Sequence, residues 1–235
     1  MLSERMLTNV SFIDRGSKVA DIGCDHGFVG IYLIKEGIAD KVIAMDVGEM
    51  PLERAREHIE EAGLSDRIET RLSDGIKELK LDDKGEPEVD SILIAGMGGR
   101  LAIKILSDSI EKARKLKNIV LQPQSELDYV RDNLKEMGFC IKDEKMTFEG
   151  GKYYTTMKVV SGDMKALSEE ESLYGPVLLA EKNELLFNFL MMEKEKFTGV
   201  VDSIESKEDF DPADSGYISV SRKLERVNKA LNYYK

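Results

Sequence analysis

Short apolar runs alternate with helical patterns over the first 162 residues of the chain. The runs are only a few residues long, which is typical of strands, while apolar residues between them recur at helical spacing. This alternation predicts βαβ units and a largely parallel sheet. The expected strands are Lys18–Gly23, Lys41–Asp46, Arg67–Leu72, Val89–Ala95 and Lys117–Gln122, and the expected helices between them lie at about 28–36, 51–62, 99–107 and 127–137.

The two ends of this region depart from the alternation. Residues 1–15 carry apolar side chains at helical spacing, which predicts a short amphipathic helix. Residues 139–145 and 153–160 are strand patterns with glycines but no helix between them, so we expect an antiparallel edge. The predicted fold class is therefore α/β, a Rossmann-like domain with a mostly parallel sheet.

The pattern after Gly162 is helical only. One helix is expected from about Gly175 to Ile204, and a second helix near the end of the chain carries an apolar seam. Two such helices packed antiparallel form a helical hairpin. The sequence thus predicts two domains, a catalytic domain over residues 1–162 and a coiled-coil-like hairpin over residues 163–235. The seam of the last helix consists of Val220, Leu224, Val227 and Leu231.

Composition narrows the function classes. Hydrophobic residues make up 42% of the 235 residues, enough for a sizeable core, and the two cysteines lack metal-ligand spacing. The cysteine spacing leads us to expect no metal. We find no signal-peptide pattern and no apolar run of the roughly 18 residues that a membrane span needs, so we expect a cytoplasmic protein. The net charge of −11 argues against a nucleic-acid partner, although a local basic stripe can bind RNA on an acidic protein.

The first strand ends in an acidic, glycine-rich turn, Asp21-Ile-Gly23-Cys-Asp25-His26-Gly27. Glycines here allow a ligand to approach the backbone, but their spacing is not the G-x-G-x-x-G of dinucleotide-binding proteins. Carboxylates would repel a pyrophosphate and suit a cationic ligand. S-adenosylmethionine offers such an end, an amino group beside its sulfonium. A purely structural turn is the alternative.

Two more acids follow strands. Asp46 can accept hydrogen bonds from both ribose hydroxyls, and Asp74 can reach the adenine amino group of the same cofactor. A solvated strand-end acid and a turn-forming Asp-Gly are the respective alternatives. Since ligands of open α/β sheets bind at the carboxyl ends of the strands, the series favours one cofactor site. Its expected residues are Asp21, Gly23, Asp25, His26, Gly27, Asp46, Val47, Asp74, Gly75, Ala95, Gly96 and Met97.

The fourth and fifth strands end in turns suited to a flat base. Glycines in Ala95–Gly99 let a base come close to the backbone, and carboxamides in Gln122-Pro123-Gln124 can hydrogen-bond a base edge. Tight structural turns are the alternative for both. His26 is more readily interpreted as a structural residue than as a base, and His58 as a solvated helix residue.

These motifs resemble the bacterial tRNA (adenine-22-N1) methyltransferase family. The resemblance spans essentially the whole chain and implies methyl transfer from S-adenosylmethionine to N1 of an adenine in tRNA. The chain departs from the family in having Gln124 where asparagine is common and Asp46 in a Met-Asp-Val rather than a Gly-Glu-Val turn. The motifs are Asp21–Gly27, Ile94–Arg100, Leu121–Gln124, Gly151–Tyr154 and Tyr174–Leu178.

N1 of neutral adenine has a lone pair, so the reaction requires alignment rather than an obligatory base. We expect Asp25, Gln122, Pro123 and Gln124 to act at the reacting base. A basic face of the last helix and a positive path on the helix after Gly99 would hold tRNA. The expected substrate-binding residues are Gly98, Gly99, Arg100, Lys104, Arg222, Arg226 and Lys229.

Three alternatives stay open at this point. The acceptor is another RNA, a protein or a small molecule; the chain is a non-catalytic RNA-binding module that keeps S-adenosylmethionine as a structural ligand; or it is a nicotinamide dehydrogenase, which the glycine spacing disfavours. A monomer is expected, though the sequence leaves the oligomeric state open.

Overall fold

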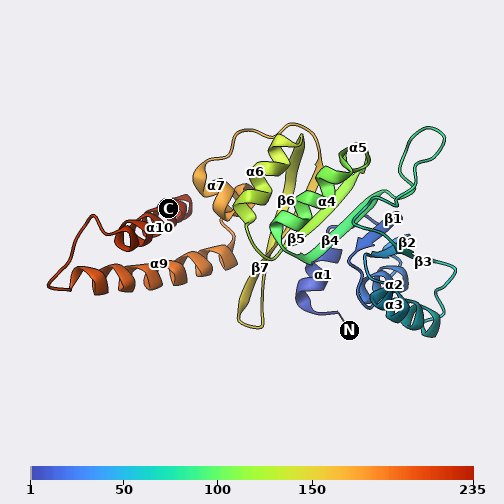
Figure 1. Cartoon of the computed structure of the whole chain (residues 1–235), viewed down its shortest axis with the longest axis horizontal. Coiled ribbons are helices and arrows are strands. Elements are labelled where there is room, and N and C mark those ends of the chain that lie inside the picture. Colours follow the sequence, from blue (N-terminus) through green and yellow to red (C-terminus); the bar gives the residue numbers. More distant parts are fainter. Residues whose placement is uncertain (1) are drawn as a thin grey trace. The chain divides into compact units, whose positions relative to one another are not determined.

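The computed structural model describes residues 2–235, which form two compact units divided between Ala166 and Leu167. The first unit contains a seven-stranded sheet with the order β3-β2-β1-β4-β5-β7-β6 (Figure 1). Strands β1 to β5 pair in parallel, and β7 pairs antiparallel with both β5 and β6. The predicted Rossmann-like α/β fold with an antiparallel edge is thus confirmed. The strands are β1 (Ser17–Ile22), β2 (Ala39–Asp46), β3 (Ile68–Leu72), β4 (Ser91–Met97), β5 (Asn118–Pro123), β6 (Phe139–Glu149) and β7 (Lys152–Ser161).

Helices cover both faces of this sheet because its central strands are apolar on both sides. On one face, Val19, Val42 and Leu93 are fully buried in a cluster with residues of α2 and α3. Successive strand residues point to opposite faces, so Ile43 and Ile92 are buried on the other face, where α4 packs on β4, β5 and α6. The helices of this unit are α1 (Glu4–Val10), α2 (Phe28–Lys35), α3 (Glu49–Glu61), α4 (Gly99–Asp108), α5 (Ile110–Ala113) and α6 (Leu127–Glu136).

The first helix is shorter than the 1–15 helix expected from the sequence. It ends at Val10, with Ser11 as its C-cap, and the chain then turns so that Phe12 and Ile13 enter the core. Ser3 begins the helix by accepting a hydrogen bond from the Met6 backbone N–H. The apolar pattern of residues 10–13 therefore reflects burial after the helix and not its continuation.

The second unit consists of helices, as predicted, but its long helix is interrupted. Instead of one helix from Gly175 to Ile204, the chain has α8 and α9, separated at Lys182, which adopts a positive φ of 53°. Asn183 caps the new helix by accepting a hydrogen bond from the Leu186 backbone N–H. The elements are α7 (Glu169–Tyr174), α8 (Pro176–Ala180), α9 (Glu184–Glu205), α10 (Ser215–Leu231) and a final 3-10 turn η1 (Asn232–Tyr234).

The two long helices α9 and α10 pack antiparallel. Near their connecting loop, the Tyr217 hydroxyl of α10 donates to Glu205 of α9 over 2.7 Å. At the other end, the Tyr234 hydroxyl donates to the carbonyl of Asn183 over 2.9 Å. Residues of both helices, among them Leu190 and Val227, are fully buried. Among residues 2–235, we find no helix whose length and apolar character suit a membrane crossing.

Candidate functional site

The carboxyl ends of the parallel strands meet at one edge of the sheet, and Asp21 lies there on the central strand β1. Its side chain is buried, at 5% exposure, and Oδ2 has no hydrogen-bond partner among the described residues. Burial, with a further contribution from the Asp46 charge, raises the pKa of Asp21 to about 7. An unsatisfied buried carboxylate is costly for the fold and fits a site that receives a cation.

The turn after β1 requires its glycines. Gly23 and Gly27 have φ values of 74° and 72°, in the left-handed region that other residues disfavour. The Gly23 N–H donates to the Met45 carbonyl over 2.8 Å, which ties the turn to β2. A Cβ on Gly23 would lie 2.4 Å from Cε of Met97, so the turns after β1 and β4 are in direct contact. Asp25 also has a positive φ, 47°, and is exposed.

The other two predicted acids differ in their surroundings. Asp46 ends β2, half-buried, and Oδ1 accepts a hydrogen bond from the Gly48 backbone N–H over 2.9 Å. Asp74 lies beyond the end of β3, exposed, and forms an ion pair with Lys77, which lowers the pKa of Asp74. Asp46 is thus held beside Asp21 on the neighbouring strand, whereas Asp74 is an exposed carboxylate that already pairs with Lys77.

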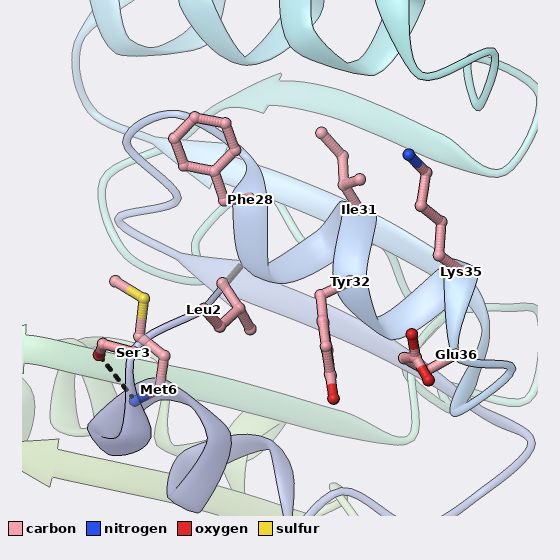
Figure 2. Close-up of a pocket in the computed structure, with 8 residues that line it drawn as sticks. All are labelled: Leu2, Ser3, Met6, Phe28, Ile31, Tyr32, Lys35 and Glu36. Carbon is pink, nitrogen blue, oxygen red and sulfur yellow. Dashed lines mark hydrogen bonds between the residues drawn. The ribbon is translucent and has the colours of Figure 1, made fainter.

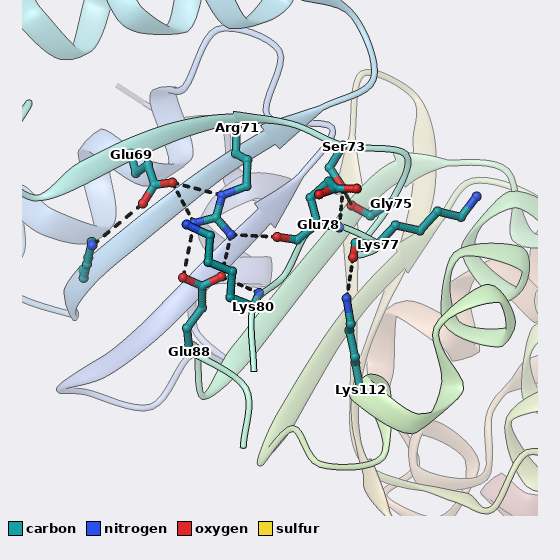
Figure 3. A network of polar contacts seen from close by, with 10 residues as sticks. Glu69, Arg71, Ser73, Gly75, Lys77, Glu78, Lys80, Glu88 and Lys112 are labelled. Carbon is teal, nitrogen blue, oxygen red and sulfur yellow. Dashed lines mark hydrogen bonds and ion pairs between the residues drawn. The ribbon is translucent and has the colours of Figure 1, made fainter. Parts of the chain in front are cut away.

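A polar network fixes the loop that follows β3 (Figure 3). Arg71 forms ion pairs with Glu69 and Glu88 at 2.6 and 2.5 Å, and its Nη1 also donates to the Glu78 carbonyl. These carboxylates raise the pKa of Arg71 further above its usual range. Lys112 of α5 donates to the Lys77 carbonyl from the other side. The network therefore holds the loop that carries Asp74 and Gly75.

The glycines after β4 have unequal surroundings. Gly96 is exposed with a φ of 76°, and a Cβ there would come no closer than 3.7 Å to Gln124 Nε2. Gly99 is buried, and a Cβ there would lie 2.5 Å from the Ser125 carbonyl oxygen. A Cβ could therefore be accommodated at exposed Gly96, whereas its absence at Gly99 allows α4 to pack against the loop after β5.

The turn after β5 is anchored by Arg5, a residue that the sequence did not single out. Gln122 is fully buried, and its Oε1 accepts a hydrogen bond from Arg5 Nη1 over 2.6 Å. Pro123 is buried beside it, while Gln124 is exposed and its backbone N–H donates to the Met97 carbonyl. The helical pattern around Arg5 gave no signal of this contact, because the two residues lie 117 positions apart.

Aromatic side chains gather next to the glycine turn. The exposed Phe28 ring stacks on His58, with centroids 4.6 Å apart, and His26 stacks on the same phenyl ring at 5.5 Å. His58 Nδ1 lies 3.0 Å from the His26 carbonyl oxygen. The expectation of a solvated His58 is therefore wrong, because the ring bridges α3 to the turn.

Phe28 also borders a groove of about 520 Å³ between α1 and α2 (Figure 2). Apolar side chains from both helices form most of its lining, and Lys35 and Glu36 lie at one end (Figure 2). Its lining residues are Leu2, Ser3, Met6, Phe28, Ile31, Tyr32, Lys35 and Glu36. No group of three or more potential metal-ligating side chains occurs among residues 2–235.

The predicted tRNA-binding cations all have acidic neighbours. In the first unit, Arg100 pairs with Glu126 at 2.6 Å and Lys104 pairs with Asp108. In the second unit, Arg222 and Arg226 of α10 both contact Glu169 of α7, and Lys229 pairs with Glu225 at 2.9 Å. The basic face of α10 thus exists, but internal carboxylates neutralise part of it.

The parallel sheet, the acidic glycine turn and the buried Asp21 define a methyltransferase domain, and the family model described as "Methyltransferase domain" matches residues 2–157. The tRNA (adenine(22)-N(1))-methyltransferase of Bacillus subtilis is 28% identical over 237 residues, covering 99% of this chain and 98% of the relative. A crystal structure of the B. subtilis M1A22 tRNA methyltransferase has a TM-score of 0.82 at 27% identity, covering 98% of this chain and 99% of the other.

A Streptococcus pneumoniae protein provisionally assigned as a tRNA (m1A22) methyltransferase is 30% identical with a TM-score of 0.88, covering 98% of this chain and 100% of the other. The same protein has also been solved in complex with S-adenosyl-L-methionine, with a TM-score of 0.82 to this chain. The chain belongs to the tRNA (adenine-22-N1) methyltransferase family. The resemblance that the motifs indicated is thereby confirmed.

Proposed function

We propose that this protein transfers a methyl group from S-adenosylmethionine to N1 of adenine 22 in tRNA. The observation that carries the proposal is the buried carboxylate of Asp21 near the carboxyl end of β1, whose Oδ2 has no hydrogen-bond partner among the residues that the structure describes. The full-length similarity to tRNA (m1A22) methyltransferases supports the choice of acceptor.

The residues of the edge fit the cofactor. Asp21 Oδ2 has no hydrogen-bond partner among residues 2–235 and would accept a hydrogen bond from the ligand's amino group, while the positive φ of Gly23 and Gly27 shapes the turn beside it. Asp46 would bind the ribose hydroxyls. The loops carrying Val47, Asp74 and Gly75 and the turn Ala95-Gly96-Met97 would surround the adenine and the sulfonium. When bound, S-adenosylmethionine supplies a methyl group activated by its positively charged sulfur.

The chain's own residues would align the acceptor base. N1 of neutral adenine uses its lone pair to form the new N–C bond while the S–C bond electrons return to sulfur, so no proton is lost and the positive charge passes to the base. Asp25 and Gln124 are exposed residues of the turns after β1 and β5, and their side-chain oxygens would stabilise that charge. Exposed Gly96 would let the base lie flat against the backbone at the end of β4. His26 would help to shape the glycine turn after β1.

Holding tRNA requires positive groups, and we assign them to Arg100 and Lys104 beside Gly98-Gly99, and to the α10 cations Arg222, Arg226 and Lys229. Each has an acidic neighbour. Phosphates would therefore compete with these carboxylates for the cations. A protein with a net charge of −11 would then bind RNA only where several phosphates meet these cations at once. We further propose a cytoplasmic monomer.

The deciding experiment is transfer of tritiated methyl from S-adenosylmethionine to unmodified tRNA transcripts, followed by nucleoside analysis. We expect 1-methyladenosine in transcripts with adenine at position 22 and none when that base is guanine. Cofactor binding without methyl incorporation would instead support the non-catalytic RNA-binding module. Label in a different nucleoside would contradict the proposed acceptor.

A further inference from the structure

Helix α1 is attached firmly to the antiparallel edge of the sheet. Thr147 Oγ1 of β6 donates to Thr8 Oγ1 over 2.9 Å, and Thr156 Oγ1 of β7 donates to Asn9 Oδ1 over 2.7 Å. Just after the end of the helix, the Phe12 carbonyl accepts a hydrogen bond from Asn118 Nδ2 of β5 over 2.7 Å. These contacts fix the helix relative to β5, β6 and β7, and with it the direction of the Arg5 side chain.

Arg5 is held from several sides. Its backbone N–H donates to Glu149 Oε2 over 3.0 Å, and its guanidinium carbon lies 5.1 Å from the centroid of the Tyr154 ring. The side chain is only 19% exposed. The cation–π contact and the bond to Gln122 leave the planar guanidinium little freedom to rotate. Arg5 is thus a preorganised donor and not a mobile surface cation.

The contact with Arg5 determines how the Gln122 carboxamide is turned. Arginine has only donors, so the carboxamide oxygen must face Arg5 and the NH₂ group must face away. Gln122 Nε2 is buried and has no hydrogen-bond partner among residues 2–235. Buried amide donors are almost always paired, so an unpaired one beside a site is a candidate contact for a ligand that offers an acceptor.

The unpaired amide belongs to the strand next to the turn proposed to receive the acceptor base. Gln122 is the register partner of Ala95 on β4, and Gly96 follows at once. A Cβ on Gly96 would lie 4.0 Å from Arg5 Nη1 and 3.7 Å from Gln124 Nε2. The Gly96 turn is therefore bordered by the Arg5 guanidinium and by the Gln124 carboxamide, and the same guanidinium is bonded to buried Gln122.

We propose that Arg5 is a positioning residue of the adenine site, which holds Gln122 Oε1 and so presents the Gln122 NH₂ group to an acceptor nitrogen of the methyl-accepting base. This inference rests on the proposed function. Adenine offers N3 and N7 as such acceptors, while its N1 lone pair must stay free to receive the methyl group. With the carboxamide reversed, Gln122 would present an oxygen and could meet only donors of the base.

Glu149 completes the arrangement. The methylated base is a cation, and an unpaired guanidinium beside it would oppose the reaction. Glu149 Oε1 lies 3.9 Å from Arg5 Nε, and the hydrogen bond from the Arg5 backbone keeps the pKa of Glu149 below its usual range, so the carboxylate stays ionised. Arg5 can therefore direct Gln122 without leaving a net positive charge at the site.

The test separates the two ends of the Gln122 carboxamide. Gln122→Glu keeps an acceptor for Arg5 but removes the NH₂ donors, so kcat on tRNA should fall by about 100-fold, the scale of a misaligned base. Cofactor affinity and the thermal unfolding temperature should not change. Arg5→Ala should lower kcat similarly, and Arg5→Lys should restore part of it.

The matched control is Arg114→Ala. Arg114 is an exposed arginine just before β5, and its guanidinium donates to the Met137 carbonyl. Its replacement should leave kcat and KM unchanged. Normal turnover of Gln122→Glu would overturn the inference, since Arg5 would then only fasten α1. A higher KM with unchanged kcat in Arg5→Ala would overturn it too and indicate a phosphate contact. Should the unmodified protein itself transfer no methyl to tRNA, the proposed function fails, and the inference with it.

Discussion

Asp21 and Asp46 end neighbouring parallel strands, and the charge of Asp46 adds to burial in raising the pKa of Asp21 to about 7. The pairing is unfavourable for the protein alone, because two carboxylates lie at the same edge and buried Asp21 Oδ2 has no hydrogen-bond partner among residues 2–235. A cationic ligand reverses this balance. The carboxylate pair that destabilises the ligand-free protein would therefore strengthen cofactor binding.

The first prediction concerns the pH dependence of cofactor affinity. A cation prefers the ionised form of Asp21, and that form is dominant only above the pKa of about 7. Affinity for S-adenosylmethionine should fall by up to about tenfold per pH unit below pH 7 and become constant above it. Calorimetric titrations between pH 5.5 and 8.5 measure this slope. A flat profile for the protein, matching that of Asp21→Asn, would remove Asp21 from the cofactor site.

The second prediction concerns stability without ligand. The folded pKa of Asp21 is raised from 3.8 to about 7, so the folded protein loses stability as pH rises between these values. Asp21→Asn removes a penalty of as much as roughly 4 kcal/mol at pH 8. The variant should therefore unfold at a higher temperature than the original at pH 8 and not at pH 4. Asp25→Asn, the same change on an exposed carboxylate, should show no such pH-dependent gain.

The third prediction separates two roles of Asp46. Its Oδ1 accepts from the Gly48 backbone N–H, which shapes the turn into α3, and its carboxylate is proposed to bind ribose hydroxyls. Asp46→Asn keeps an oxygen for Gly48, whereas Asp46→Ala does not. Both should weaken cofactor binding, the alanine variant by roughly 1.5–3 kcal/mol. Only the alanine variant should also lower the unfolding temperature, and equal affinity for all three proteins would contradict the assignment.

Much of this edge could be predicted from the sequence because its signals are local. Asp21, Gly23 and Gly27 stand within one turn, directly after an apolar strand, and short apolar runs fix the order of strands and helices. The break at Lys182 was not predicted, since Leu179 before it and Leu186 after it keep a helical spacing that continues across the break. In the structure, the positive φ of Lys182 and the cap by Asn183 mark the interruption.

Contacts between distant segments could not be predicted in this way. Arg5 meets Gln122 through the packing of α1 on the sheet, and His58 meets Phe28 through the packing of α3 beside α2. Neither pair has a periodic or motif signature. The shared partner of Arg222 and Arg226 was missed for the same reason, since Glu169 lies more than fifty positions away from both.

The fourth prediction concerns the glycines that begin α4. A Cβ on Gly99 would lie 2.5 Å from the Ser125 carbonyl oxygen, a backbone atom that cannot move aside cheaply, whereas on Gly98 it would meet only Ser125 Oγ at 3.5 Å. Gly99→Ala should destabilise the protein by about 1–3 kcal/mol. Gly98→Ala should leave the unfolding temperature unchanged. Equal stability of the two variants, measured in urea, would show that the loop after β5 yields freely.

The last prediction addresses how an acidic protein holds tRNA. Arg222 and Arg226 share Glu169 as a partner, so a phosphate that binds them must displace this carboxylate. If α10 holds tRNA, Glu169→Gln should tighten binding by freeing both cations, while replacing Arg222, Arg226 and Lys229 with alanine should weaken it. The alanine variant should also flatten the dependence of affinity on salt by about one unit of slope per lost phosphate contact. Glu208→Gln removes one negative charge from an exposed loop position of the same unit and controls for net charge alone. Equal tightening by Glu169→Gln and Glu208→Gln would show that only the overall charge matters, and an unchanged salt slope in the alanine variant would show that α10 does not contact the RNA backbone.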